Sequence, residues 1–268
     1  MSKKFSLIIF TDLDGSLLHR DNFKFDVIKD YIKSLIDEGI IIIPNTSKTE
    51  KEIDGFITEL GSDLPYISEN GSSIHGLNLI NANFPNKIIL SRDKKELYEI
   101  FNLEVPKVLK NKCKFILNMN TNQQAKIFGL QDNNLKNALD RKYTIPFLFE
   151  GNKIEKNKLL KILRSTSLNM QDGGRVLNLG DSTDKVKSMN QVLKIYKKVE
   201  NKVKVKCVGD NFNDLDMLKN CDIPCLVFND QFKRDQINID NLIVSNKPSP
   251  EGWSDVIKTA LVKLSYKD

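Results

Sequence analysis

Apolar residues follow two different patterns over the first sixty positions, unbroken runs and helical spacing. Residues 6–11 and 40–44 are nearly unbroken apolar runs, which predicts strands buried on both faces of a parallel sheet. Residues 26–38 and 49–60 space their apolar side chains at helical intervals instead, and Gly39 ends the first of these segments. This alternation of buried strand and amphipathic helix predicts right-handed crossovers and a doubly wound α/β fold.

The alternation of buried strand and amphipathic helix returns near the C-terminus. The middle segment between the two parts has a different pattern of long helices and short strands. The C-terminal elements that we predict are strands at 203–210, 223–228 and 242–245 and helices at 213–220 and 251–264. In the middle segment we predict helices at 94–110 and 154–164 and strands at 114–119, 146–150, 167–172 and 175–180. The pattern therefore predicts a Rossmann-like core of residues 1–84 and 179–268, into which an α+β domain of residues 85–178 is inserted.

Two carboxylates directly follow the first predicted strand. Asp12 and Asp14 stand at its carboxyl end, the edge of an open α/β sheet where ligands bind. Gly15 allows the chain to turn away, so that one carboxylate can attack phosphorus while the other handles the proton of the leaving group. Asp-Gly is also a common turn signal, so a purely local role stays open on this motif alone.

A second acidic group ends the predicted strand at 203–210. Asp210 and Asp214, with Asn213 beside them, belong to the same sheet edge as the first pair. Clustered carboxylates repel one another unless a hard cation lies among them, and Mg²⁺ prefers carboxylates, waters and phosphate oxygens. The alternative is a capping box that opens the following helix.

Two further side chains suit a phosphate group. Thr46 follows the predicted strand at 40–44, and Lys185 precedes an amphipathic segment. A phosphoryl group in transfer needs hydroxyl or backbone donors and a cation aimed at its oxygens, which these side chains can supply. Each alone has an ordinary alternative, a helix cap for Thr46 and a solvated lysine for Lys185. Their order relative to the two acidic groups favours phosphate binding.

In that order the segments resemble the four motifs of the haloacid-dehalogenase-like phosphatases. The matching segments, which span nearly the whole chain, are DLDGS, NTSK, Lys185 and GDNFND. The resemblance implies that Asp12 is a nucleophile that becomes an aspartyl phosphate, that Asp14 is the general acid and base, and that Mg²⁺ is the cofactor. The implied metal-binding residues are Asp12, Asp14, Asp210 and Asp214, and the implied substrate-binding residues are Thr46, Ser47, Lys48, Lys185 and Asn213.

The inserted segment carries a finer resemblance. ISENG at 67–71 and the insert itself are similar to the branch of the family with an α/β cap, which also contains sugar-phosphate and sucrose-phosphate phosphatases. NTSKT, ISENGS, RKYTIPF, GGRVLNLG and DSTDK together resemble the mannosyl-3-phosphoglycerate phosphatases. Val186 departs from the pattern, because glycine commonly follows the lysine of the third motif. The resemblance implies hydrolysis of mannosyl-3-phosphoglycerate to mannosylglycerate, a compatible solute, and phosphate.

A phosphorylated glycosyl glycerate carries a carboxylate beside its phosphate. Arginine presents a planar fork to a carboxylate that lysine does not reproduce. Arginines are scarce in this lysine-rich chain, and we predict that Arg141 and Arg175, both in the inserted domain, contact the substrate. The alternative is that they form surface or interdomain ion pairs.

Other functions fit parts of the pattern. A glucosyl-3-phosphoglycerate or sucrose-phosphate phosphatase differs in its sugar pocket, and the sequence does not distinguish a mannosyl from a glucosyl substrate. A phosphosugar mutase shares the aspartyl phosphate but returns the phosphoryl group to a sugar. A receiver-like signalling module also phosphorylates an aspartate, but a switch should keep its phosphoryl group longer than one turnover, and Asp14 and the long insert argue against it.

The charge pattern, the cysteines and the apolar runs of the chain bear on which partners and which compartment we expect. The net charge of +6 comes from lysines scattered among acidic residues, so we predict no nucleic-acid partner. A small-molecule substrate is what the resemblance implies. The 4 cysteines lack the paired spacing of a zinc site or a disulfide framework. The sequence shows no signal segment and no apolar run of about 18 residues, which predicts a cytoplasmic protein without a membrane partner. The oligomeric state stays open.

Overall fold

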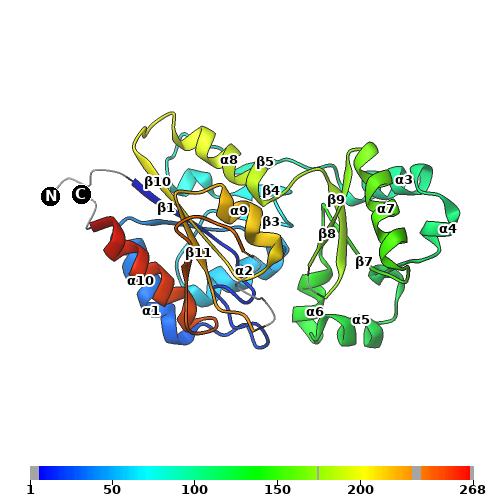
Figure 1. Ribbon diagram of the computed structural model, residues 1–268, viewed down its shortest axis with the longest axis horizontal. Coiled ribbons are helices and arrows are strands. Elements are labelled where there is room, and N and C mark those ends of the chain that lie inside the picture. Colours follow the sequence, from blue (N-terminus) through cyan, green and yellow to red (C-terminus); the bar gives the residue numbers. More distant parts are fainter. Residues whose placement is uncertain (1–5, 174, 231–236, 266–268) are drawn as a thin grey trace.

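The computed structural model describes residues 6–173, 175–230 and 237–265. Outside these ranges lie residues 1–5, 231–236 and 266–268 of the predicted core and Gly174 of the predicted insert. The described chain forms two lobes, a core with a central sheet and a smaller cap (Figure 1).

Five parallel strands form the central sheet, in the order β12-β11-β10-β1-β2. The strands are β1 (Ser6–Thr11), β2 (Ile41–Pro44), β10 (Val203–Gly209), β11 (Ile223–Leu226) and β12 (Ile243–Val244). Thr11 pairs with Val208 of β10 and with Pro44 of β2, so the carboxyl ends of these three strands are nearly level. Side chains that follow them therefore meet at one edge of the sheet.

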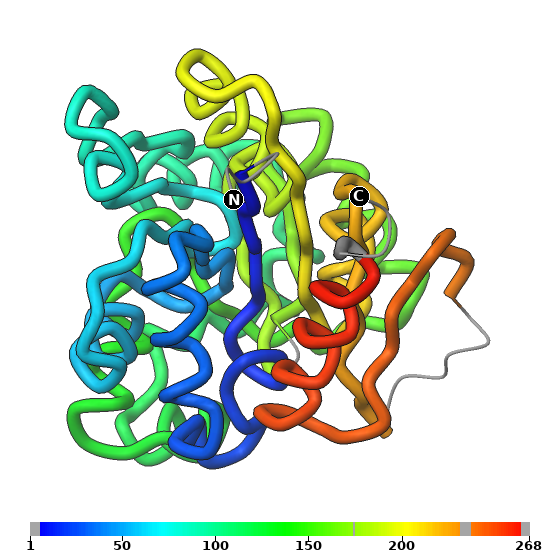
Figure 2. Tube along the Cα trace, turned by 90° about the vertical axis from the view of Figure 1, so that its left-hand side faces the viewer, coloured from blue at the N-terminus to red at the C-terminus, as the bar shows by residue number. Residues whose placement is uncertain are grey.

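Helices cover both faces of this sheet. One layer consists of α1 (Asp26–Asp37), α2 (Glu50–Leu60) and α10 (Glu251–Ser265), and the other of α8 (Lys185–Tyr196) and α9 (Leu215–Lys219). Leu7 and Ile9 of β1 pack with the first layer, and Ile8 and Phe10 pack with the second. Figure 2 shows α1 and α10 side by side along β1. The predicted doubly wound fold class is confirmed, and no described helix is long and apolar enough to cross a membrane.

A small antiparallel sheet that the sequence did not predict lies beside β2. It consists of β3 (Tyr66–Ser68), β4 (Ser73–His75) and β5 (Lys87–Ile89), with the short helix η1 (Leu77–Leu79) between the last two. A bridge between Asn45 and Ile67 joins β3 to the end of β2. Each strand has 3 residues, which is too short to show the alternation that reveals a strand.

The cap contains a four-stranded antiparallel sheet in the order β6-β7-β9-β8. Its strands are β6 (Cys113–Phe115), β7 (Ile145–Phe149), β8 (Leu168–Asp172) and β9 (Leu177–Asp181), and its helices are α3 (Lys94–Glu104), α4 (Lys107–Lys110), α5 (Thr121–Phe128), α6 (Asp132–Leu139) and α7 (Lys153–Ser165). The sheet lies between the core and the layer of α3 and α7 (Figure 1). Leu177 and Leu179 pack with that outer layer, so Asn178 between them faces the core.

Strand pairing and packing bear on where the two lobes divide. β5 pairs with β4, and Leu90 still packs in the core cluster, whereas Leu97 belongs to the cap cluster. β9 runs on to Asp181. Because junctions at 84/85 and 178/179 would separate β5 from its partner and cut β9, we propose junctions near residues 91–93 and 182–184 instead.

Two predicted cap elements differ from the structure. The helix predicted at 94–110 is broken, since α3 ends at Glu104, Val105 is extended and α4 starts after Pro106. Proline lacks an N–H and pushes the residue before it out of the helical region, which explains the break. The strand predicted at 114–119 ends at Phe115, where the short helix η2 (Ile116–Asn118) begins.

Candidate active site

Three carboxylates meet at the carboxyl edge of the central sheet. Asp12 follows β1, and its N–H donates to the carbonyl of Val208 at 2.9 Å, which fixes its position beside β10. Asp210 follows β10, and Asp214 lies one turn further on. The side chains of Asp12, Asp210 and Asp214 are all buried, and one oxygen from each lies within 4.8 Å of the others.

Lys185 stands behind this group of carboxylates. Its Nζ lies 2.6 Å from Asp12 Oδ1 and 2.7 Å from Asp214 Oδ1. Asp184 caps α8 by accepting the N–H of Lys187 at 2.7 Å, so the helix starts at Lys185 itself. The departure at Val186 therefore does not displace Lys185.

Asp214 has a structural role as well as a place in the acidic group. Its Oδ2 accepts the N–H of Asp210 at 3.1 Å and that of Asn211 at 3.3 Å, which is part of the capping box considered from the sequence. A Cβ on Gly209 would lie 2.3 Å from the Cβ of Asp214, so the close approach requires glycine. The cap and the acidic group coexist, because one oxygen of Asp214 holds the turn while the other faces Lys185.

Asp210 is held by residues that the sequence analysis did not single out. Ser16 Oγ donates to its Oδ1 at 3.1 Å, Asn229 Nδ2 donates to its Oδ2 at 3.1 Å, and the guanidinium of Arg20 pairs with Oδ2. Gly15 has a φ of 81°, and a Cβ there would lie 2.6 Å from Asp210 Oδ2. The scarcity of arginine, together with the position of Arg20 soon after Asp12, is the signal that would have pointed to it.

The ionisation of these groups reflects burial and mutual repulsion. Burial raises the pKa of Asp12 to about 7, Lys185 opposes the rise, and the neighbouring carboxylates add to it. Burial and Asp214 raise the pKa of Asp210 to about 6, against Arg20. Burial would lower the pKa of Lys185, but Asp12 and Asp214 raise it above its usual value, so Lys185 stays charged. Added positive charge among the carboxylates would relieve their repulsion.

Asp12, Asp210 and Asp214 fit a divalent cation by the chemistry of their donors. Their grouped oxygens are hard ligands of the kind that Mg²⁺ takes. Burial and neighbouring carboxylates raise the pKa of Asp12 and Asp210, and added positive charge would offset that rise. Asp14, which we predicted as a further ligand, has its carboxylate outside this group, 3.0 Å from Lys48 Nζ.

Asp14 lies at the cavity with a different set of neighbours. Its side chain is 37% exposed, and Lys48 bridges it to Glu52, whose Oε1 lies 3.3 Å from the same Nζ. Desolvation raises the pKa of Asp14 above its usual value, with Lys48 opposing and Glu52 adding to the rise. A carboxyl group that keeps its proton more readily than usual and faces the cavity is suited to exchange protons with a ligand.

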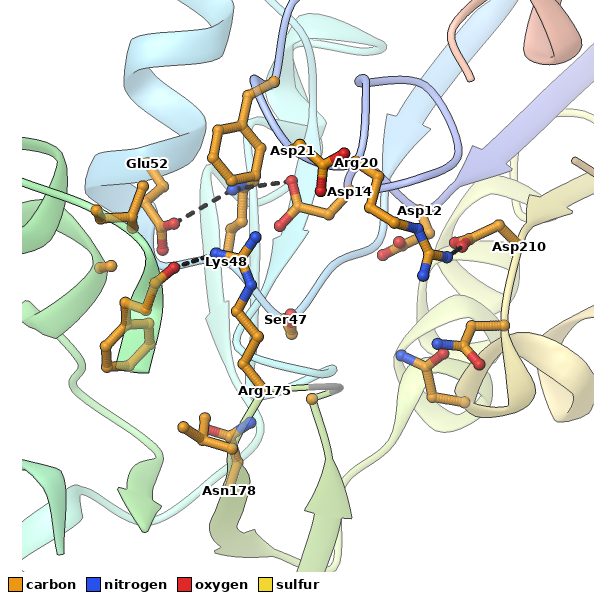
Figure 3. Close-up of a pocket in the computed structure, with 18 of the residues that line it drawn as sticks. Asp12, Asp14, Arg20, Asp21, Ser47, Lys48, Glu52, Arg175, Asn178 and Asp210 are labelled. Atoms are coloured by element: carbon orange, nitrogen blue, oxygen red, sulfur yellow. Dashed lines mark hydrogen bonds and ion pairs between the residues drawn. The ribbon is translucent and has the colours of Figure 1, made fainter. Parts of the chain in front are cut away.

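The cavity between core and cap has a volume of about 350 Å³. Figure 3 shows Asp12 and Asp210 on one side of it, Asp14, Lys48 and Glu52 on the other, and Arg175 entering from the cap. Of the predicted site residues, the cavity wall includes Asp12, Asp14, Ser47, Lys48, Arg141, Arg175, Asp210 and Asn213. Thr46, Lys185 and Asp214 lie behind that wall and are buried.

The two predicted cap arginines are placed differently. Arg175 donates from Nη1 to the carbonyl of Phe128 and lies 5.9 Å from the centre of the Phe23 ring. Arg141 is 5% exposed, and its guanidinium makes hydrogen bonds within the chain. It donates to the carbonyls of Ala138 and Ser47, each at 3.2 Å. Arg141 therefore ties the cap to the core at the cavity edge.

The fold and this site define a class of protein. The family model of the haloacid dehalogenase-like hydrolases matches residues 9–238, and the chain belongs to that family. Solved structures of haloacid dehalogenase-like hydrolases from Bacteroides thetaiotaomicron and B. subtilis share the fold, each with a TM-score of 0.65 at 16% identity. They cover 96% and 94% of this chain, and 100% and 98% of their own.

Within that class, the chain resembles a particular group of phosphatases. The relative from Persephonella marina, named glucosyl-3-phosphoglycerate/mannosyl-3-phosphoglycerate phosphatase, is 30% identical over 94% of this chain and 96% of its own length. A relative of the same name from Methanococcoides burtonii is 29% identical over 96% and 97%. The mannosyl-3-phosphoglycerate phosphatase of Pyrococcus horikoshii is 26% identical over 88% and 96%. The chain is thus a haloacid dehalogenase-like phosphatase that resembles the mannosyl-3-phosphoglycerate phosphatases.

Proposed function

We propose that this phosphatase hydrolyses mannosyl-3-phosphoglycerate to mannosylglycerate and phosphate. The observation that carries the proposal is the position of Arg175, which enters from the cap a cavity whose core side holds Asp12 and Asp14. A ligand that joins a phosphate to a carboxylate and a sugar matches this division, because the core meets the phosphate and the cap meets the rest.

The carboxylate of Asp12 is the nucleophile in the proposed reaction. One of its oxygens forms a bond to phosphorus while the bond from phosphorus to the glycerate oxygen breaks, and Asp14 gives its proton to the departing oxygen. Asp14 then takes a proton from a water molecule that attacks the phosphorus, which releases phosphate and restores Asp12. Lys185 holds Asp12 in place at 2.6 Å throughout.

A bound Mg²⁺ would be held by Asp12, Asp210 and Asp214 and would supply positive charge against the phosphoryl oxygens. The residues proposed to accompany it at the phosphate are Thr46, Ser47, Lys48, Lys185 and Asn213. Among these, Ser47, Lys48 and Asn213 reach the cavity directly, whereas Thr46 supports the loop by accepting the N–H of Lys48 at 3.4 Å.

Glucosyl-3-phosphoglycerate is the second candidate substrate. Two of the relatives carry both sugars in their names, and the glucosyl and mannosyl substrates present the same phosphate and carboxylate. The proposed role of Arg175 is the same for either sugar, since the arginine is assigned to the carboxylate.

The test is phosphate release from both glycosyl phosphoglycerates and from p-nitrophenyl phosphate, with Mg²⁺ and with excess chelator. Wild type should hydrolyse all three only with the metal. Arg175→Ala should lower kcat/KM for the glycosyl phosphoglycerates by about 30- to 1000-fold, because it removes a charge-assisted contact in a partly desolvated site. It should leave p-nitrophenyl phosphate nearly unchanged, because that ester has no carboxylate.

The matched control is Arg164→Ala, which removes an exposed arginine from α7 in the same lobe. It should leave all three rates within about twofold. Equal loss on all substrates in Arg175→Ala would assign the residue to folding or closure, and no loss on any of them would place it outside the substrate site.

A further inference from the structure

The turn between β3 and β4 has an uncommon backbone. Glu69 and Asn70 both have positive φ, at 45° and 59°, and Gly71 follows at 94°. Such conformations cost about 1 kcal/mol or more outside glycine, and they persist where surrounding contacts impose them. The turn therefore calls for contacts that hold it in place.

Those contacts come from the two loops beside the candidate nucleophile. The N–H of Glu69 donates to the carbonyl of Lys48 and the N–H of Asn70 to that of Thr46, both at 2.9 Å. A Cβ on Gly71 would lie 2.2 Å from the carbonyl oxygen of Asp184, the residue before Lys185. The turn is thus packed against residues 46–48 and against the start of α8.

The carboxylate of Glu69, a residue of the core, accepts hydrogen bonds from the cap. It is 1% exposed and accepts the N–H of Lys142 at 2.8 Å, the N–H of Tyr143 at 3.1 Å and the hydroxyl of Thr144 at 2.6 Å. Hydrogen bonds to a buried carboxylate are stronger than neutral ones, and losing them would leave the charge buried without partners.

The cap also contacts loop 46–48 directly, through Arg141. The hydroxyl of Thr144 also accepts from Nη1 of Arg141 at 3.0 Å, and that nitrogen donates to the carbonyl of Ser47 at 3.2 Å. Loop 46–48, Glu69, Thr144 and Arg141 therefore form a closed circuit of hydrogen bonds. If the cap moves away, the circuit breaks at Glu69 and at Ser47 together.

We propose that Glu69 is a positioning residue that couples the position of the cap to the geometry of loop 46–48. The inference rests on the function proposed above in so far as that loop meets the phosphoryl group. A second cap contact, from Lys142 Nζ to Glu50 at 2.7 Å, joins the same cap segment to α2 from a lysine side chain that is 46% exposed. That ion pair is outside the circuit and supplies a matched control.

The experiment compares Glu69→Gln, Thr144→Val, their double variant and the control Lys142→Met. Kinetics use p-nitrophenyl phosphate, so the readout does not depend on the glycosyl substrate. Each single variant should lower kcat by about 10- to 100-fold with KM changed less than about threefold, because displaced phosphate contacts slow the chemical step. The double variant should be no slower than the slower single variant, and Lys142→Met should stay within about twofold.

Hydrogen exchange provides the structural readout. Uptake should rise both in the cap segment 142–144 and in the segment 46–49 of the core when either side chain is changed. Thr144→Val breaks the circuit from the cap side, so the test holds even if Glu69→Gln fails to fold. The proposal is overturned if the effects of the two substitutions multiply, or if exchange rises in the cap alone while kcat is unchanged. If wild type cleaves p-nitrophenyl phosphate but no glycosyl phosphoglycerate, the substrate proposal fails and the test of Glu69 still stands.

Discussion

At the scale of single residues, the acidic side chains of the site lose their hydration when they are buried, and this loss carries a free-energy cost. Asp12, Asp210 and Asp214 are buried within one group, and burial raises the pKa of Asp12 and Asp210. Lys185 and Arg20 offset part of that cost, since each contacts one or two of the carboxylates. Such an arrangement concentrates negative charge where a cation and a phosphate would meet.

Asp12→Asn should abolish phosphate release while leaving the fold intact. The amide is nearly isosteric and can still accept from Lys185, but it cannot form an acyl phosphate, and loss of a nucleophile typically costs a factor of about 10⁴ or more. The measurement is phosphate release together with thermal unfolding of the same preparation. Residual activity above about 1% of wild type in a clean preparation would refute the assignment.

His75 should make stability depend on pH. It is 9% exposed, stacks on Tyr66 with ring centres 4.6 Å apart, and its Nε2 lies 2.9 Å from Ser73 Oγ. Burial lowers the pKa of His75 to about 4, with Glu50 opposing and Lys87 assisting.

Because the folded pKa of His75 lies below the unfolded value, its contribution is complete above about pH 6.5 and is lost as the pH falls towards 4. Between pH 7 and pH 5, wild type should lose about 1 kcal/mol more unfolding free energy than His75→Gln in urea titrations, after allowance for screening by water. Parallel curves for the two proteins would contradict a neutral buried His75.

At the scale of elements, strand β10 carries a lysine side chain that is buried in the core. Its Lys206 is fully buried, and its Nζ has no hydrogen-bond partner within the described part of the chain. Burial lowers the pKa of Lys206 to about 8. An unpaired ammonium group in a core strand lowers the stability of the folded state.

Lys206→Met should therefore stabilise the protein by about 2 kcal/mol at pH 7, because Met fills similar space without a charge. The gain should shrink as the pH rises from 8 to 10.5 and vanish above that, where the lysine becomes neutral in the unfolded chain as well as in the folded one. Urea unfolding at several pH values measures it. Lys204→Met on the same strand removes an exposed lysine and should change stability by less than about 0.5 kcal/mol. A destabilised Lys206→Met would show that the ammonium group has a partner.

For the whole molecule, the two chain segments between core and cap are joined to each other. Arg92 in the first segment binds Asp181 at the end of β9, with Nε–Oδ2 at 2.8 Å and Nη2–Oδ1 at 2.9 Å. Its Nη2 also donates to the carbonyl of Ser167 at 3.1 Å. This bidentate pair restrains the two connections as one unit, which favours a single orientation of the cap.

Arg92→Met should loosen both connections together. We expect a loss of about 1 to 2 kcal/mol in unfolding free energy and faster hydrogen exchange at residues 90–93 and 181–184, because the bidentate pair is only partly exposed. Exchange in β1 and β10 should stay unchanged. Lys247→Met, which removes an exposed ion pair with Asp255, is the control and should alter neither quantity. Faster exchange in only one of the two segments would show that they move independently.

Features with a local signature were readable from the sequence. The run at 6–11 forms β1, and the run at 203–210 forms β10, which ends at Gly209. Asp12, Asp210 and Asp214 meet after these strands, because parallel strands place their carboxyl ends side by side. The resemblance to the haloacid dehalogenase-like phosphatases rested on four segments in their order along the chain, which are DLDGS, NTSK, Lys185 and GDNFND. The break before Pro106 was also locally encoded, although the apolar periodicity on both sides concealed it.

Contacts between distant segments were decided only by the tertiary structure. Arg20 reaches Asp210 across a separation of 190 residues, and Glu69 reaches Thr144 across 75. Such pairs leave no periodic trace, since each side chain is an isolated polar residue in its own segment. The sequence likewise predicted Asp14 as a metal ligand and Arg141 as a substrate contact without showing what either side chain binds in the folded chain. The folded chain turns Asp14 towards Lys48 and binds Arg141 to the backbone, because the direction of a side chain depends on neighbours that only folding brings together.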